Sequence, residues 1–75
     1  MRLSDGEVGK SYIIKSIEGG CMAKDRLLKL GLIPGSIITL KRKAPLRGPL
    51  MVEINGNDVV VGRGISVKII IEELD

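Results

Sequence analysis

Histidine, phenylalanine and tryptophan are absent from this 75-residue sequence, and Tyr12 is its only aromatic residue. Without histidine the chain lacks the usual general base near neutral pH and the commonest metal ligand. With one aromatic ring it cannot build the stacking platform of a single-stranded nucleic-acid binder, or the aromatic groove that receives proline-rich peptides. Nucleic acid is therefore not an expected partner.

Cysteine and long apolar runs are also scarce. Cys21 is the only cysteine, so no internal disulfide can form, which fits a reducing compartment. No apolar run approaches the ~20 residues of a membrane helix. The opening residues, MRLSDGEVG, reach charge and glycine too early for a signal peptide. We therefore expect a cytoplasmic protein.

The net charge is small, because positive and negative residues are nearly balanced. Twelve Lys and Arg residues face nine Asp and Glu residues, which gives a net charge of +3. The two signs are mixed except in the basic stretch KRKAPLR and the acidic ending EELD. This balance predicts a solvated surface with one basic patch rather than a polyanion binder. A length of 75 residues predicts a single domain over residues 1–75, and a hydrophobic share of 44% is enough for its core.

Glycines separate short runs of β-branched residues, a pattern typical of short strands. The expected strands are residues 11–17, 35–43, 50–54, 57–61 and 67–73. Asn55-Gly56 is the strongest hairpin signal, and residues 62–64 form a tight link into the last strand. Alternation predicts that the inward-facing residues include Ile38, Leu40, Leu50, Val52, Ile54, Val67, Ile69 and Ile71.

The segment CMAKDRLLKL, residues 21–30, has the period of a helix instead. Its residues Ala23, Leu27 and Leu30 fall on one helical face. Gly31 stands where a left-handed C-cap is favoured, and Pro34 prevents continuation. Such a short helix is not stable alone, so its apolar face must dock on another element.

Five short strands and one short helix predict a mainly β fold. We expect a small, five-stranded, partly open barrel whose strands share one core. The helix at about 21–30 would plug one end and bury Leu27 and Leu30 where no strand closes the barrel.

Three ordered segments carry a resemblance to a known family: LSDGEVGKSYIIKSIEGG, RLLKLGLIPGSIITL and APLRGPLMVEING. They resemble the FeoA family of small SH3-like barrel proteins that accompany the bacterial ferrous iron transporter. The resemblance runs from Leu3 to Glu72. Its most specific part is Arg26-Leu27 with the pairs Gly31-Leu32, Pro34-Gly35, Ala44-Pro45 and Gly48-Pro49 in order.

The resemblance implies a non-enzymatic accessory role in ferrous iron uptake. The chain would bind the cytoplasmic GTPase part of the ferrous iron permease and modulate its assembly or activity. Iron would pass through the permease, so we expect no cofactor and no resident metal, and membrane contact only through the transporter.

Two other functions are weighed against this one. The same module resembles the C-terminal SH3-like domain of iron-dependent repressors, so the alternative is a stand-alone regulatory or nucleic-acid-binding module. This chain shows neither the DNA-binding nor the dimerisation domain of those repressors, which favours the free-standing form. An enzyme or direct iron carrier is the third hypothesis, but the spacing of Glu18, Asp25 and Asp58 suggests no shared site.

Two groups of residues are candidates for partner binding. On the helix, Met22, Arg26 and Leu28 would form an apolar anchor with a basic rim. In the next strand and loop, Lys41, Lys43 and Arg47 would form a patch for an acidic protein surface or the anionic inner leaflet. Alternation places Lys41 and Lys43 on one side of the strand and Arg42 on the other.

Each candidate has a structural alternative. Met22 and Leu28 would fold over the barrel edge, Arg26 would bind carbonyls of the following turn, and the basic residues would be an ordinary charged strand end. Cys21 is either a reactive thiol at a helix N-terminus or a small packed hydrophobe. Ile70, outward on an expected edge strand, either permits self-association or is covered by the helix or the N-terminal residues.

Overall fold

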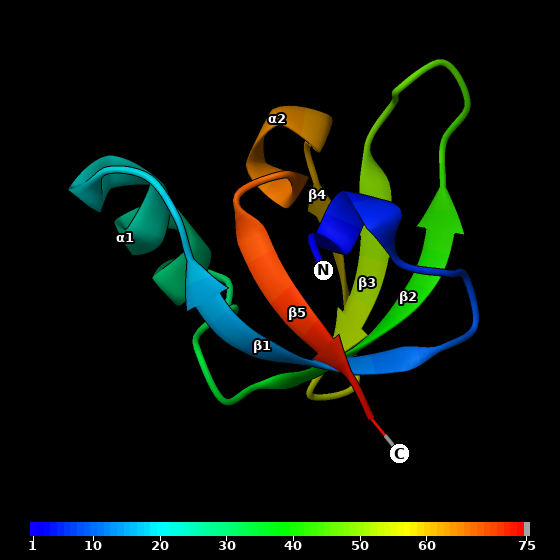
Figure 1. The fold of residues 1–75 in the computed structure, drawn as a ribbon, viewed down its shortest axis with the longest axis horizontal. Coiled ribbons are helices and arrows are strands. Elements are labelled where there is room, and N and C mark those ends of the chain that lie inside the picture. Colours follow the sequence, from blue (N-terminus) through cyan, green and yellow to red (C-terminus); the bar gives the residue numbers. More distant parts are fainter. Residues whose placement is uncertain (75) are drawn as a thin grey trace.

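The computed structural model describes residues 1–74, with the side chains of residues 21–23 outside the described part. The predicted mainly β fold is confirmed, with short helices between five strands (Figure 1). In chain order the elements are the 3-10 helix η1 (Leu3–Asp5), β1 (Ser11–Ile17), α1 (Cys21–Lys29), β2 (Ile37–Lys43), β3 (Leu50–Ile54), β4 (Asn57–Val61), α2 (Arg63–Ser66) and β5 (Ile69–Glu73).

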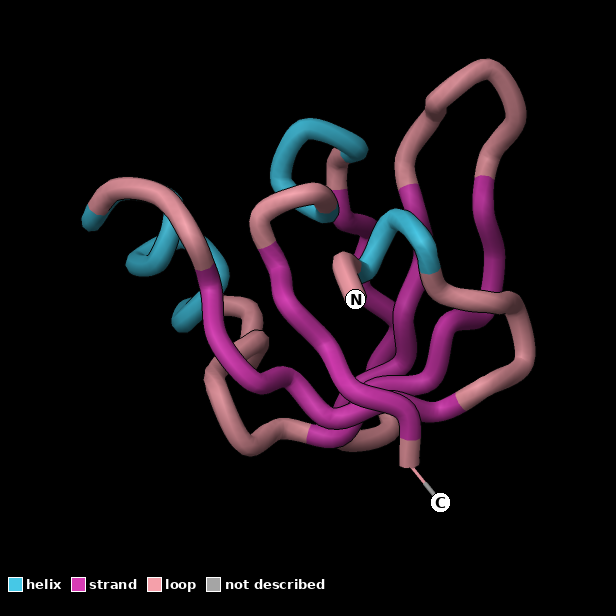
Figure 2. Tube along the Cα trace, in the orientation of Figure 1, coloured by secondary structure: helices cyan, strands magenta, loops and turns pink. Residues whose placement is uncertain are grey.

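The five strands form one antiparallel sheet in the order β4-β3-β2-β1-β5. The strands curve around a shared interior (Figure 2). The predicted hairpin turn at Asn55-Gly56 joins β3 to β4, and both residues have positive φ, 52° and 80°. Positive φ at both turn residues matches the right-handed twist of the two strands, which is why Asn-Gly is favoured there.

Two strands contain a register shift. In β1 the pairing with β5 shifts between Ile14 and Ser16, and in β2 the pairing with β3 shifts between Leu40 and Arg42. One extra residue at such a bulge bends the strand and increases its twist. The bulges therefore help a sheet of short strands to curl into a barrel.

The bulge in β2 also changes which basic residues share a face. Lys43 lies opposite the buried Leu50, so the two share the inner face. Lys41 pairs with Glu53 on the outer face at 3.2 Å, and Arg42 lies on that outer face as well. The predicted grouping of Lys41 with Lys43 is wrong, because the extra residue interrupts the alternation on which it was based.

The core draws on every strand. Its members are Leu3, Tyr12, Ile14, Ile17, Leu27, Leu32, Ile38, Leu40, Leu50, Val52, Ile54, Val61, Ile69 and Ile71. Tyr12 is buried, and its hydroxyl accepts a hydrogen bond from the Glu7 backbone N–H at 2.8 Å. That bond satisfies a polar group that would otherwise be buried without a partner. Of the inward residues predicted for the strands, only Val67 is outside this core.

Helix α1 docks through Leu27 but not through Leu30, which is 42% exposed. The helix ends in a Schellman motif: Gly31 has φ 85°, its N–H donates to Leu28, and the Leu32 N–H donates to the Leu27 carbonyl at 2.9 Å. The reversal at Gly31 brings Leu32 into the core beside Leu27. The predicted burial of Leu30 is wrong because the chain leaves the helix there and Leu32 takes the core position.

The link before the last strand is longer than predicted. It contains α2, and β5 begins at Ile69, so Val67 lies at the C-terminal end of α2 and is 38% exposed. The predicted inward position of Val67 is wrong for that reason. Ile70 is covered in part by the N-terminal residues, since Arg2 forms a bridge with Ile70 and the Met1 carbonyl accepts from Ile71. This is one of the two arrangements expected for that edge.

Candidate protein-binding site

Helix α1 stands beside the barrel and leaves a groove on each side. The first groove lies between α1, the end of β1 and the turn after the helix, with a volume of about 300 Å³. Leu28, 58% exposed, and Ile33, 40% exposed, lie in its wall. Its lining residues are Ser16, Ile17, Lys24, Asp25, Leu28, Leu32, Ile33 and Pro34.

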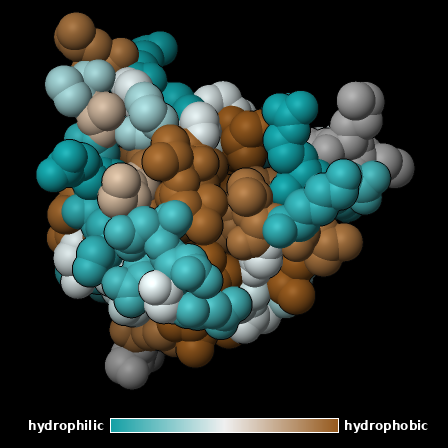
Figure 3. All heavy atoms as spheres, turned by 180° about the vertical axis from the view of Figure 1, so that it is seen from behind, coloured by the Kyte–Doolittle hydropathy of each residue, from teal (hydrophilic) through white to brown (hydrophobic). Residues whose placement is uncertain are grey.

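The second groove lies between α1, β4 and α2, with a volume of about 210 Å³. Its lining residues are Arg26, Leu27, Leu30, Val60, Val61, Gly62 and Ile65. Val60 is 60% exposed, although it belongs to a strand. Figure 3 shows hydrophobic side chains gathered across the middle of the face seen from behind, bordered by hydrophilic ones.

Charged side chains stand at the edges of both grooves. Lys24 and Asp25 line the first groove, Arg26 lines the second, and Lys29 is exposed on the same helix. Exposed apolar side chains within a polar rim are the usual arrangement of a protein-binding surface. The structure thus places the predicted residues Arg26 and Leu28 in different grooves, on either side of one helix. The predictions for Met22 and Cys21 fall on side chains outside the described part of the chain.

The predicted basic group of Lys41, Lys43 and Arg47 is not one cluster. Lys41 is paired with Glu53, and the Lys43 Nζ donates to the Ser4 carbonyl at 3.1 Å. Arg47 is exposed in the loop between β2 and β3. Lys41 therefore stands apart from the other two, whereas Lys43 bonds to Ser4 of η1 and Arg47 lines a pocket that Ser4 and Asp5 also line.

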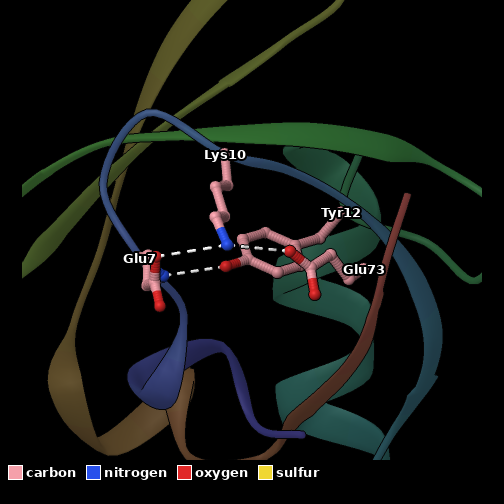
Figure 4. Close-up of polar contacts among 4 residues, drawn as sticks. All are labelled: Glu7, Lys10, Tyr12 and Glu73. Carbon is pink, nitrogen blue, oxygen red and sulfur yellow. Dashed lines mark hydrogen bonds and ion pairs between the residues drawn. The ribbon is translucent and has the colours of Figure 1, made fainter. Parts of the chain in front are cut away.

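A polar cluster at the other end of β1 ties the N-terminal turn to β5 (Figure 4). The Lys10 Nζ lies 2.9 Å from a Glu73 carboxylate oxygen and 3.3 Å from one of Glu7. Hydrogen bonds to Glu73 and Glu7, with their negative charges, raise the pKa of Lys10 above 10.5. Because Lys10 is solvent-exposed, this cluster orients the turn more than it stabilises the fold.

The described side chains contain no group of three His, Cys, Asp or Glu residues that could hold a metal ion. Within residues 1–74, no helix has both the length and the hydropathy needed to cross a bilayer.

Sequence reasoning missed several residues of the two grooves. Leu30 was expected in the core, and neither Ile33 nor Val60 was singled out. Exposure of an apolar residue is set by what packs over it, so composition alone gives little signal. The end of the helical pattern at Gly31 is the one local signal in the sequence that indicates an exposed Leu30.

Comparison with known proteins gives a consistent result. The FeoA domain model matches residues 1–73. A relative from Methanocaldococcus jannaschii that carries the name Fe(2+) transport protein A is 32% identical over 73 residues, which cover 97% of this chain and 87% of that protein. A Porphyromonas gingivalis protein named as a fusion of Fe(2+) transport protein A with the Fe(2+) transporter FeoB is 35% identical over 72 residues, which cover 96% of this chain and 8% of the fusion.

Solved structures share the fold. A crystal structure of an iron uptake regulatory protein, FeoA, has a TM-score of 0.88 at 27% identity, over 97% of this chain and 95% of that one. The repressor ScaR contains the same fold in 37% of its chain, with a TM-score of 0.90 at 18% identity, a likeness of fold alone. The family match, the curated relatives and the shared fold agree, and the chain therefore belongs to the FeoA family of non-catalytic proteins of ferrous iron transport.

Proposed function

We propose that this chain binds the cytoplasmic GTPase part of a ferrous iron permease and modulates the assembly or activity of that transporter. In this role iron is the cargo of the permease and does not reside on the chain. The chain works on the cytoplasmic side and meets the membrane only through the transporter.

The observation that carries this proposal is the Porphyromonas gingivalis fusion. There a segment similar to 96% of this chain is joined covalently to a FeoB transporter. Joining two modules converts their contact into an intramolecular event with a high effective concentration. A separate chain of the same kind has no tether, so it needs a surface whose own contacts hold the complex together.

The α1 surface, defined as α1 with the two grooves beside it, supplies such contacts. Leu28 and Ile33 are exposed in one groove, and Leu30 and Val60 in the other. Burying exposed Leu, Ile and Val side chains provides affinity, and the charges of the rim provide orientation and association rate. Since α1 is anchored by Leu27 in the core, its outer residues are held in place before a partner arrives.

The test is a binding titration of the chain against the purified full-length permease of the same organism. The permease is examined without nucleotide, with GDP and with a non-hydrolysable GTP analogue. We expect saturable binding in at least one state, and Leu28→Asp to weaken it at least about tenfold, since burial of a leucine is lost and a charge is buried.

Val8→Asp is the matched control, because Val8 is 55% exposed, about as much as Leu28, and lies outside both grooves. It should bind like the wild type. Absence of binding in all three nucleotide states, together with unchanged iron uptake in cells that lack the chain, would contradict the proposal.

A further inference from the structure

The loop between β2 and β3, residues 44–49, projects from the body of the barrel (Figures 1 and 2). Leu46, at its tip, is 99% exposed. No other large hydrophobic residue in the described part of the chain exceeds 60%. A leucine held entirely in water at a projecting tip gains nothing from folding, so its whole side chain is available for burial against a partner.

The backbone at this tip is held in a conformation that its residues disfavour. Leu46 has φ 57° and Arg47 has φ 59°, and the Gly48 N–H donates to the Pro45 carbonyl at 3.1 Å. Positive φ at both central residues is the geometry of a type I′ turn, which normally contains Asn-Gly or Asp-Gly. With Leu-Arg in these positions the turn is strained, because the Cβ atoms crowd the neighbouring carbonyls.

Neighbouring groups hold the strained loop in place. The Arg63 Nε of α2 donates to the Gly48 carbonyl at 3.1 Å, and its Nη2 to the Ala44 carbonyl at 3.5 Å. The Ala44 N–H donates to the Pro49 carbonyl at 3.0 Å. One guanidinium thus links both arms of the loop and restrains the position of the tip between them.

Within residues 41–49 the charges have one sign, whereas Asp5 of η1 lines a pocket together with Arg47 and Arg63. Residues 41–49 contain Lys41, Arg42, Lys43 and Arg47 and no acidic residue. Lys41 is paired with Glu53, whereas Arg42 and Arg47 are exposed. Leu46 is followed in the chain by the exposed Arg47, and an apolar residue next to a guanidinium group is complementary to an apolar pocket with a carboxylate at its edge.

We propose that Leu46 is an anchor that enters an apolar pocket with a carboxylate rim on the cytoplasmic part of the permease. This rests on the proposed function and adds a second contact to the α1 surface. We favour a protein pocket over a lipid bilayer, because holding the leucine side chain in one direction increases the affinity only for a partner that has a fixed shape. One leucine with a few cations also gives only marginal membrane binding.

Leu46→Asn separates this role from a role in folding. Asparagine tolerates positive φ, so the variant should unfold at the same temperature as the wild type or higher. It lacks the apolar anchor, so its Kd for the purified full-length permease should rise at least about tenfold. Leu46→Met keeps an apolar side chain and should stay within about threefold of the wild type. Val8→Asn, an exposed residue far from the loop in sequence, is the control and should bind normally.

The possible results separate this inference from the proposed function. If Leu46→Asn binds like the wild type while Leu28→Asp is weakened, the anchor is overturned and the proposed function stands. If the wild-type chain does not bind the permease, both fail. Vesicles of phosphatidylglycerol and phosphatidylethanolamine should not retain the chain; retention that Leu46→Asn abolishes would assign the tip to the membrane and overturn the anchor.

Discussion

Gly48 and Gly64 differ in the space that a side chain would find at each position. A Cβ placed on Gly48 would lie 2.7 Å from the Ala44 Cβ and 3.1 Å from the Pro45 carbonyl oxygen. A Cβ on Gly64, in α2, would meet nothing within 4 Å. Glycine is therefore required by close packing at the first position and replaceable at the second.

The two alanine variants should differ in sign. Gly48→Ala should lower the free energy of unfolding by about 1–3 kcal/mol, because both contacts must be relieved by moving backbone. Gly64→Ala should raise it by up to about 1 kcal/mol, since alanine loses less backbone entropy in a helix. Urea denaturation of both variants measures the difference. Equal effects would show that the loop does not close as described.

Lys10 gives a prediction about alkaline pH. Its pKa is raised by the hydrogen bonds to Glu73 and Glu7, so the folded state binds this proton more tightly than the unfolded state. The resulting stabilisation is complete below pH 10.5 and is lost as the pH rises through the higher folded-state pKa. The difference in unfolding free energy between wild type and Lys10→Met should be constant up to that range and shrink above it.

Lys10→Arg is the control for this titration. An arginine stays charged throughout the alkaline range, so its pairing with the two carboxylates should persist where that of lysine fades. Urea denaturation of the three proteins across the alkaline range separates the cases. A constant difference between wild type and Lys10→Met at all pH values would mean that the cluster is not formed in solution.

At the scale of the element, the described part of α1 places an anchoring residue directly next to an exposed one. Leu27 is buried in the core and Leu28 is exposed in a groove. Leu27→Ala should cost about 2–5 kcal/mol of unfolding free energy through lost burial and a cavity. Leu28→Ala should change it by less than about 0.5 kcal/mol.

Thermal or urea unfolding of these two variants checks the orientation of the helix. If Leu28→Ala were the more destabilising change, the helix would be rotated about its axis, and the α1 surface would lose its apolar anchor. Binding should respond differently from stability: Leu28→Ala should weaken association with the permease although the variant remains fully folded.

Most elements could be predicted from local patterns. The strands at 11–17, 50–54 and 57–61 have the predicted bounds, because alternation and the Asn55-Gly56 turn both act over a few residues. The helix was predicted to within a residue at its end, since Gly31 supplies an unambiguous C-cap. Local chemistry and the final fold agree at these places.

The errors arise where a residue depends on distant partners. Leu3 was not expected in the core, and it is buried there because the N-terminal residues lie along β5. The bulge that moves Lys43 to the inner face depends on pairing between β2 and β3. The grooves beside α1 depend on three separate segments, so neither their walls nor the exposure of Val60 could be inferred from neighbours in sequence.

At the scale of the whole molecule, the barrel presents exposed apolar residues on two of the segments that connect its strands. The α1 surface comes from the connection of β1 to β2, and the Leu46 tip from that of β2 to β3. The first connection leads into β2 and the second leaves it, and β2 is paired on both sides within the sheet. A partner that contacts both features therefore meets surfaces whose separation is fixed by the barrel, which limits the entropy lost on binding.

The most direct measurement is amide hydrogen exchange of the chain alone and in complex with the full-length permease. We expect slower exchange in the complex over residues 24–33 and 44–48. Exchange over residues 11–14 of β1 and over β5 should be unchanged, since these residues are paired within the sheet and line neither groove. Protection confined to β1 and β5, or a saturated complex in which residues 24–33 exchange as in the free chain, would contradict binding through the α1 surface.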